Sequence, residues 1–423
     1  MGNVIDCLKS RGLVDSITSE ELISKVSSPI KVYVGFDPTA DSLHLGNLLG
    51  IVILRWFQKF GHTPYVILGG ATGRIGDPSG KSKERPLLDD ETIENNIAKI
   101  RKNFSRVLDF SVSNSPVFFN NFEWFSKINV IDFLRDTGKH FRLGVMLAKD
   151  SVKTRVNSED GMSFTEFSYQ LLQGYDFYHL LNAHDVCLQM GGSDQWGNIT
   201  AGTDLIRKLS SKSAYGLTFP LLTRSDGKKF GKSEEGAIWL SEEKCSPYQF
   251  YQYLVKVSDA DVIKMLRMLT FIELDEIDRI ENSMNSDGYL PNSAQKKLAE
   301  ELTRMIHGEQ GLQKALKVTE GTQPGAKDVQ LDYETLKEIS HDMPNVRLKK
   351  EVVLGSKFTD VAATSGIVSS KGEAARLVSG GGAYLNNNKI EDPLFKISEN
   401  DLIGGKYLML GSGKKKKLLI EIE

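Results

Sequence analysis

Short apolar runs alternate with longer amphipathic segments up to about residue 220. Four runs have the apolar, β-branched composition of buried strands: residues 31–36, 64–68, 116–119 and 185–190. After the first run, apolar residues recur at helical spacing: Leu45, Leu48, Leu49, Val52 and Ile53. We therefore expect a helix to begin near His44 and to reach about Phe57. The alternation predicts an α/β domain with a parallel sheet and a ligand site at the carboxyl ends of its strands.

The pattern changes in the second half of the chain. From residue 247 to about residue 339, apolar positions at helical spacing predict mainly helices, and residues 320–327 predict a flexible joint. Residues 347–423 contain 13 Lys+Arg and 9 Asp+Glu, a net charge of +4, whereas the rest of the chain has a net charge of −6. A basic module on an acidic body indicates contact with nucleic acid. For the lysine run 414–417, RNA contact and a solvated turn remain alternatives.

Composition limits the class of protein. The 423 residues, 40% hydrophobic and 26% charged, are typical of a soluble chain of two or three domains, and no apolar run reaches the roughly 18 residues of a membrane helix. Three cysteines indicate a reducing compartment. The N-terminus has neither an apolar signal segment nor an Arg-rich transit segment, which predicts a cytoplasmic location, with a processed organellar form as the alternative. No H-x-x-x-H or C-x-x-C spacing occurs, so no protein-bound metal is expected.

The segment 33–47 carries the first candidate chemistry. It reads Tyr-Val-Gly-Phe-Asp-Pro-Thr-Ala-Asp-Ser-Leu-His-Leu-Gly-Asn, so the expected strand stops at Asp37 and the expected helix opens near His44. A helix N-terminus favours an anion, and His44 can donate to a phosphate oxygen. Gly46 lets a base or ribose approach the backbone. Taken alone, His44 favours an ordinary strand–helix turn, and only together with the distant lysines does it favour a ligand site.

Two further segments add positive charge. Residues 229–233, Lys-Phe-Gly-Lys-Ser, form a lysine loop that could close over a pyrophosphate, although a solvated turn would have the same composition. The loop lacks the G-x-x-x-x-G-K-[ST] spacing of a P-loop. The charged segment 80–85 could likewise be a solvated loop. With segment 33–47, these features favour a site that holds a polyphosphate from two sides.

A polar face is predicted on one helix. Tyr169, Gln173 and Asp176 occur at i, i+4 and i+7, which places all three on one side of a helix. Such a stripe can face solvent. Because this one is narrow, with a Tyr and a short carboxylate on an otherwise apolar helix, a ligand-facing stripe is favoured.

Five segments carry a family resemblance, in order along the chain: residues 38–47, 69–81, 164–176, 189–198 and 229–233. The first and last resemble the two signature motifs of class I aminoacyl-tRNA synthetases, and the others are similar to bacterial-type tyrosyl-tRNA synthetases. The resemblance covers nearly all 423 residues. Two positions depart from it. Asn47 stands where many relatives carry His, and the lysine loop has Phe-Gly where the class pattern has Met-Ser, a variant typical of the tyrosyl branch.

The resemblance implies a tyrosine pocket. Tyr33 and Asp176 would hydrogen-bond the substrate phenol, and Gln195 would complete the pocket. The α-ammonium group would be held by Asp77, Tyr169 and Gln173. A carboxylate acceptor suits a phenol, because phenylalanine would leave Asp176 buried without a partner.

The resemblance also implies an ATP site. Gly35 and Asp37 would approach the amino-acid end and the ribose. The remaining ATP-binding residues would be His44, Gly46, Asn47, Asp194, Lys232 and Ser233. The catalytic contacts, made with the phosphates, would come from Thr39, His44, Lys81, Arg85, Lys229 and Lys232.

The implied reaction needs no protein nucleophile. The carboxylate of L-tyrosine would attack the α-phosphorus of ATP, which would carry Mg²⁺, and the tyrosyl group would then pass to the 3′-terminal adenosine of tRNA(Tyr). Catalysis would come from positioning and from stabilising charge on the phosphates. Two alternatives remain. A tryptophanyl relative is disfavoured by Tyr33 with Asp176, and a noncatalytic RNA-binding protein, such as an intron-splicing helper, is disfavoured by His44 and the intact lysine loop.

The resemblance further implies three domains: a Rossmann-like catalytic domain at 1–225, the lysine loop with a helical anticodon-recognition domain at 226–345, and an S4-like α+β RNA-binding domain at 346–423. The family forms homodimers through a surface near residues 129–149. Apolar residues there suit an interface and a core equally: Phe133, Leu134, Phe141, Leu143, Val145 and Met146.

Overall fold

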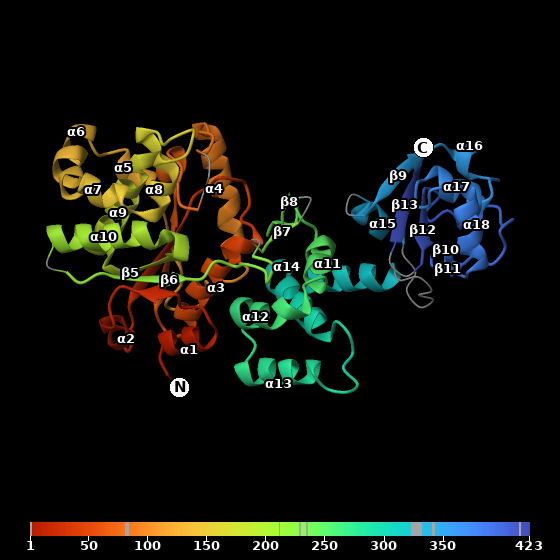
Figure 1. The fold of residues 1–423 in the computed structure, drawn as a ribbon, viewed down its shortest axis with the longest axis horizontal. Helices are drawn as coiled ribbons and strands as arrows, with labels where there is room; N and C mark the ends of the chain where they lie inside the picture. The colour runs from red at the N-terminus through yellow and green to blue at the C-terminus, as the bar shows by residue number, and fades with distance from the viewer. Residues whose placement is uncertain are drawn as a thin grey trace. The chain divides into compact units, whose positions relative to one another are not determined.

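The computed structural model describes residues 2–80, 84–210, 212–227, 230–233, 236–322, 332–340, 343–413 and 416–423; for Lys232, Ser233 and several others it describes the backbone alone. The chain forms two compact units (Figure 1). The first contains Met1–Lys244 and Val257–Ile306, and the second contains Cys245–Lys256 and His307–Glu423. Within the described ranges, no helix combines the length and apolar character needed to cross a membrane.

The first unit is built on a six-stranded sheet with the strand order β1-β6-β5-β2-β3-β4. The strands are β1 (Ser16–Ile17), β2 (Lys31–Phe36), β3 (Thr63–Leu68), β4 (Val117–Asn120), β5 (Val186–Gly192) and β6 (Tyr215–Phe219). Strands β2 to β6 pair in parallel, as the alternating sequence pattern predicts. All four expected strands are confirmed within one or two residues at each end.

The sequence pattern missed the other edge of this sheet. Strand β6 was not expected, and β1 pairs with it antiparallel, so the sheet is not wholly parallel. Strand β6 is buried along its whole length, and its short Tyr-Gly-Leu-Thr-Phe run has neither clear alternation nor helical spacing. Such a run is decided by tertiary pairing rather than by local preference.

Helices flank the sheet of the first unit (Figure 1). The helices of this unit, of which α12 and α13 lie away from the sheet, are α1 (Val4–Ser10), α2 (Glu21–Lys25), α3 (Leu45–Lys59), α4 (Asp90–Phe104), α5 (Phe122–Phe125), α6 (Val130–Asp132), α7 (Leu143–Leu147), α8 (Asp150–Val156), α9 (Phe164–His184), α10 (Trp196–Leu209), α12 (Asp259–Leu269) and α13 (Leu274–Met284). Short turns lie at η1 (Thr72–Arg74), η2 (Phe133–Thr137), η3 (Gly138–His140) and η4 (Ser193–Gln195). Helix α3 begins directly after His44, as expected, and is largely buried.

The helices of the second half of the chain lie in both units. Helix α11 (Pro247–Val255) belongs to the second unit, and α14 (Ser293–Gly321) begins in the first unit and ends in the second. The backbone of α14 is not helical at Gly308, where φ is 74°. Helix α15 (Tyr333–Ile339) follows in the second unit.

The second unit contains a five-stranded sheet with the order β11-β10-β12-β13-β9. Its elements are β9 (Asn345–Leu348), α16 (Lys350–Val353), α17 (Phe358–Thr364), α18 (Lys371–Ser379), β10 (Ala383–Leu385), β11 (Asn388–Lys389), η5 (Glu399–Asp401), β12 (Tyr407–Ser412) and β13 (Lys416–Ile422). Residues of α17, α18 and β12 share one apolar core, which includes Val361, Val378 and Leu410. The C-terminal part is therefore the small α+β fold that the resemblance implied.

Candidate functional site

The candidate site lies at the carboxyl ends of the parallel strands. Strand β2 leads into Asp37, and the neighbouring β5 leads into Asp194 in η4. The chain runs from β2 to β3 and β4 on one side, and from β5 to β6 on the other. In open α/β sheets a ligand binds where the strand order reverses in this way. The sheet topology therefore places the loop after β2 at the ligand-binding edge.

The predicted phenol end of the site is a buried carboxylate beside a buried hydroxyl. Asp176, on α9, is 4% exposed and accepts hydrogen bonds from Trp124 Nε1 at 2.8 Å and Asn121 Nδ2 at 3.0 Å. Burial raises the pKa of Asp176 to about 8, and the two donors oppose that rise. Tyr33 is 2% exposed, and its hydroxyl has no hydrogen-bond partner among the described residues. Burial and the charge of Asp176 raise the pKa of Tyr33 well above its usual range, so its hydroxyl stays neutral.

A second carboxylate, Asp37, lies at the middle of the site. The Tyr169 hydroxyl donates to it at 2.8 Å, and the Thr72 hydroxyl donates at 2.7 Å. Burial raises the pKa of Asp37 to about 6. Asn121 donates through the same Nδ2 to Thr72 Oγ1 at 3.0 Å and to Asp176. A continuous hydrogen-bonded network thus joins Asp37 to the carboxylate at the phenol end.

The third carboxylate, Asp77, anchors an amide cluster. Gln195 Nε2 donates to it at 2.7 Å, and the backbone N–H of Ser79 donates at 2.9 Å. Asn198 Nδ2 lies 3.2 Å from both Gln173 Oε1 and Gln195 Oε1. Three of the residues implied for the amino-acid pocket, Asp77, Gln173 and Gln195, are therefore brought together by Asn198.

The charge of the buried carboxyl groups favours one class of ligand. Asp37, Asp77 and Asp176 form no ion pair with a Lys or Arg side chain within the described ranges. Asp37 and Asp77, which have no matched cation among the described residues, make this part of the site negative, whereas the raised pKa of Asp176 leaves that group largely protonated and neutral at pH 7. Such a pocket favours a ligand with an ammonium group, and the buried Tyr33 hydroxyl adds a place for one neutral hydrogen-bonding group.

The predicted phosphate end is the N-terminus of α3. His44 is the N-cap residue, and its Nδ1 accepts from the Gly46 N–H at 3.1 Å. Asn47 Oδ1 accepts from the His44 N–H at 3.1 Å, which closes a capping box. Asn47 therefore has a structural partner. Because Nδ1 accepts, the ring proton of a neutral His44 sits on Nε2, the atom that can donate to an anion.

The lysine loop meets this helix end directly. Gly231 has a φ of 86°, and a Cβ at this residue would lie 3.1 Å from Leu45 Cβ and 3.2 Å from the Gly46 nitrogen. Gly231 thus allows both the backbone conformation and the close approach. The two signature segments, nearly 190 residues apart in the chain, are neighbours in the fold.

The remaining predicted residues lie around this edge. Gly35 and Thr39 are exposed, and Arg85 is half-buried and donates from Nε to the Asp77 carbonyl at 3.3 Å. Lys232 and Ser233 form the short strand β7, opposite β8 (Gly236–Ala237), with their side chains outside the described set. Lys81 and Lys229 lie outside the described residues. In the described part of the chain, no cluster of three His, Cys, Asp or Glu side chains could hold a metal.

Four residues of the site were not expected from the sequence: Thr72, Asn121, Trp124 and Asn198. Each acts through a side chain that bonds a predicted residue from another element. Asn198 is the last residue of the motif 189–198, but neither the motif nor its spacing predicts that this side chain bonds Gln173 and Gln195. Asn121 and Trp124 lie in and beside the short helix α5, where no periodic signal marks them.

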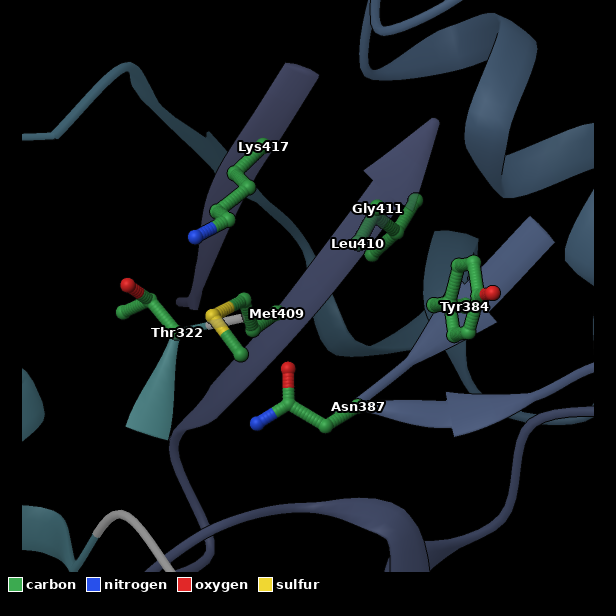
Figure 2. A pocket seen from close by; sticks show the side chains of 7 residues that line it. All are labelled: Thr322, Tyr384, Asn387, Met409, Leu410, Gly411 and Lys417. Atoms are coloured by element: carbon green, nitrogen blue, oxygen red, sulfur yellow. The ribbon is translucent and has the colours of Figure 1, made fainter. Parts of the chain in front are cut away.

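A small hollow lies in the C-terminal unit and holds none of the candidate site residues. Thr322, Tyr384, Asn387, Met409 and Lys417 line it together with Leu410 and Gly411 (Figure 2). It is too narrow to hold a ligand. Burial lowers the pKa of Lys417 to about 8, so this lysine is not part of a fully solvated turn. Lys414 and Lys415 lie outside the described residues.

Comparison with known proteins extends over both units. Residues 25–322 match the family model for class I tRNA synthetases (W and Y), and residues 335–420 match a tyrosine–tRNA ligase C-terminal domain. The chain is 56% identical to a tyrosine–tRNA ligase of Protochlamydia amoebophila over all of this chain and 99% of that one. It is 52% identical to the chloroplastic/mitochondrial enzyme of Arabidopsis thaliana over 99% of this chain and 84% of that one.

A solved structure agrees with these matches. A C-terminally truncated mitochondrial tyrosyl-tRNA synthetase of Aspergillus nidulans superposes with a TM-score of 0.66 at 31% identity, covering 74% of this chain and 92% of that one. The carboxylate pocket, the histidine-capped helix and the adjoining lysine loop thus occur in a chain that matches this family over its full length. The chain belongs to the tyrosine–tRNA ligase family of class I aminoacyl-tRNA synthetases.

Proposed function

We propose that the pocket formed by α9 and the ends of β2 and β5 binds L-tyrosine, and that ATP binds at the α3 N-terminus. The main supporting observation is the buried Tyr33 hydroxyl, which has no hydrogen-bond partner among the described residues and lies near the Asp176 carboxyl. A tyrosine phenol would bond both groups. The carboxylates Asp37 and Asp77 would attract the α-ammonium group of the same substrate.

The amino-acid contacts follow from the network. Asn121 and Trp124 orient Asp176, so that its remaining lone pairs face the phenol O–H. Tyr169, Gln173 and Asp77 would surround the ammonium group, with Gln195 closing the pocket. Held in this way, the substrate carboxylate would point toward the ATP at the end of α3.

The first reaction step would be displacement at phosphorus. A carboxylate oxygen of tyrosine forms a bond to the α-phosphorus of ATP, the bond to the bridging oxygen breaks, and pyrophosphate leaves. His44 and Thr39 would bind the γ-phosphate, while Lys81, Arg85, Lys229 and Lys232 would stabilise the charge that collects on the leaving group. Gly35, Gly46, Asn47, Asp194 and Ser233 would hold the nucleotide, and Mg²⁺ would enter with ATP.

The second step transfers the tyrosyl group to the 3′-terminal adenosine of tRNA(Tyr). We propose that the chain divides by task into three parts, at 225 and 345, with the helical segment reading the anticodon and the basic residues 346–423 contacting the tRNA. Reversing charge at the exposed Lys371 and Lys389 should weaken aminoacylation and leave pyrophosphate exchange unchanged. Equal loss in both assays would contradict a tRNA-specific role.

We also propose a homodimer. Six large apolar side chains are exposed between residues 130 and 147: Val130, Ile131, Leu134, Leu143, Val145 and Leu147. Apolar groups gathered on α6, η2 and α7 favour a second copy of the chain as their cover. Met146, in contrast, is buried and belongs to the core. Val145→Asp should give monomers by sedimentation, whereas Leu394→Asp, at an equally exposed site of the C-terminal unit, should leave dimers.

The activity is tested by tyrosine-dependent ATP–pyrophosphate exchange, with phenylalanine and tryptophan as control amino acids. Exchange with tyrosine alone supports the proposed pocket and the adenylation step together. Exchange driven by tryptophan, or no exchange from folded protein, would overturn the proposal. The cytoplasmic location stays a prediction; the relative from Arabidopsis thaliana is named as a chloroplastic/mitochondrial enzyme.

A further inference from the structure

The residues that follow the lysine loop are joined to the His44 segment by a short ladder. The Leu45 N–H donates to the Ile238 carbonyl at 2.8 Å, and the Leu240 N–H donates to the Leu43 carbonyl at 2.8 Å. His44 and Trp239 are the paired residues between these two bonds. The backbone of residue 239 is therefore fixed opposite the residue that would bind the γ-phosphate.

Side chains reinforce this pairing. The Trp239 indole lies beside the His44 imidazole, with 6.2 Å between ring centroids and an interplanar angle of 56°. Lys244 Nζ lies 4.7 Å from the centroid of the Trp239 ring and forms an ion pair with Asp41 at 2.5 Å. Asp41 also pairs with Lys99 at 3.2 Å, through the carboxylate oxygen that Lys244 does not contact. The indole thus contacts both the imidazole and a cation that is itself ion-paired.

The backbone of this segment also hydrogen-bonds to the lysine loop. The Ile238 N–H donates to the Gly231 carbonyl at 2.9 Å, and the strands β7 and β8 lie between these two residues (Figure 1). Lys232 directly follows Gly231, so its Cα lies about 3.8 Å from that anchored residue. A change in the ladder would therefore move the lysine loop and His44 together.

We propose that Trp239 is a positioning residue for adenylation: it holds the His44 ring, and the Asp41–Lys244 pair holds Trp239. This inference rests on the proposed function, because it takes His44 as a phosphate-binding group. Trp239 itself contacts no substrate in this scheme. Its effect appears in the rate of the chemical step and depends on His44 being present.

The test is a double-mutant cycle in tyrosine-dependent pyrophosphate exchange. Trp239→Leu should lower kcat about tenfold, since small misplacements of a catalytic group cost that much or more, and should leave the KM for tyrosine unchanged. In a His44→Asn background the same substitution should cost less than about twofold. Trp239→Phe should restore part of the rate, because a ring is again present.

Two controls separate positioning from general damage. Trp56→Leu removes a buried indole at the other end of α3 and should not lower kcat as Trp239→Leu does. Asp41→Asn should reproduce part of the Trp239 effect, while Lys99→Met keeps the Asp41–Lys244 pair and should behave as wild type. The Asp41 and Lys99 comparison decides the question even where Trp239→Leu fails to fold.

The outcomes are distinct. Equal losses from Trp239→Leu with and without His44, or equal losses from Asp41→Asn and Lys99→Met, would overturn the positioning role while wild-type exchange remained intact. Absence of exchange in the wild-type protein would instead refute the proposed function.

Discussion

Tyr33→Phe should make the ligand-free protein more stable and the enzyme weaker for tyrosine. The Tyr33 hydroxyl is buried, neutral and without a hydrogen-bond partner among the described residues. A buried polar group left unpaired costs about 1–3 kcal/mol. Its removal should raise the free energy of unfolding by about 1 kcal/mol, because the ring and its contact with Phe177, at 5.5 Å between centroids, remain.

Substrate binding should change in the opposite direction. A hydrogen bond between neutral groups contributes about 0.5–1.5 kcal/mol, so the KM for tyrosine should rise about 2- to 12-fold. The value of kcat should stay within twofold, because the phenol lies at the far end of the substrate from the reacting carboxylate. Discrimination against phenylalanine should fall by the same factor as tyrosine binding.

The experiment combines two measurements on one variant. Denaturation of the ligand-free protein gives stability, and pyrophosphate exchange at varied tyrosine and phenylalanine concentrations gives kcat and KM. Tyr65→Phe is the matched control: Tyr65 is the residue opposite Tyr33 on β3, and its ring packs against Phe119 and His184. Lower stability together with an unchanged tyrosine KM would refute the reasoning, since both results would mean that the Tyr33 hydroxyl already has a protein partner.

Asp176→Ala should reduce tyrosine activation at least about tenfold, because the substrate phenol would lose its bond to the buried Asp176 carboxyl and be left without that partner, while the KM for ATP changes little; unchanged activation would remove Asp176 from the pocket. Gly231→Ala should lower the exchange kcat through contact with α3, whereas Gly227→Ala has a similar φ of 80° with open space around it and serves as the control in the same kinetic assay. His62 is buried with Nδ1 accepting from the Ile30 N–H, and burial lowers its pKa to about 4. The unfolded chain therefore takes up this proton first, and stability falls as pH drops from 6.5 toward 4, by about 2 kcal/mol at pH 5. Urea unfolding at pH 7 and pH 5 should show this loss in the wild type and less of it in His62→Asn.

Local patterns in the sequence were enough to predict the central strands and the start of α3. A strand such as β2 is apolar along its length, and the helix after it has apolar residues at regular spacing, so both elements follow from nearest-neighbour preferences and burial. The polar face of α9 followed from spacing alone, and Tyr169 and Asp176 are indeed buried within the site. The family resemblance supplied the roles of single residues, which spacing could not.

The tertiary structure alone decided which side chains support that face. Asn121 and Trp124 reach Asp176 from a short helix more than 50 residues away in the chain, and Thr72 reaches Asp37 from the loop after another strand. The contact of Gly231 with the N-terminus of α3 spans an even greater distance in sequence. Periodicity records only which face of an element is buried, whereas these contacts depend on the order in which strands pair. Strand order arises from long-range packing of the whole sheet, so the sequence determined the elements and their polar faces, and the fold determined what those faces meet.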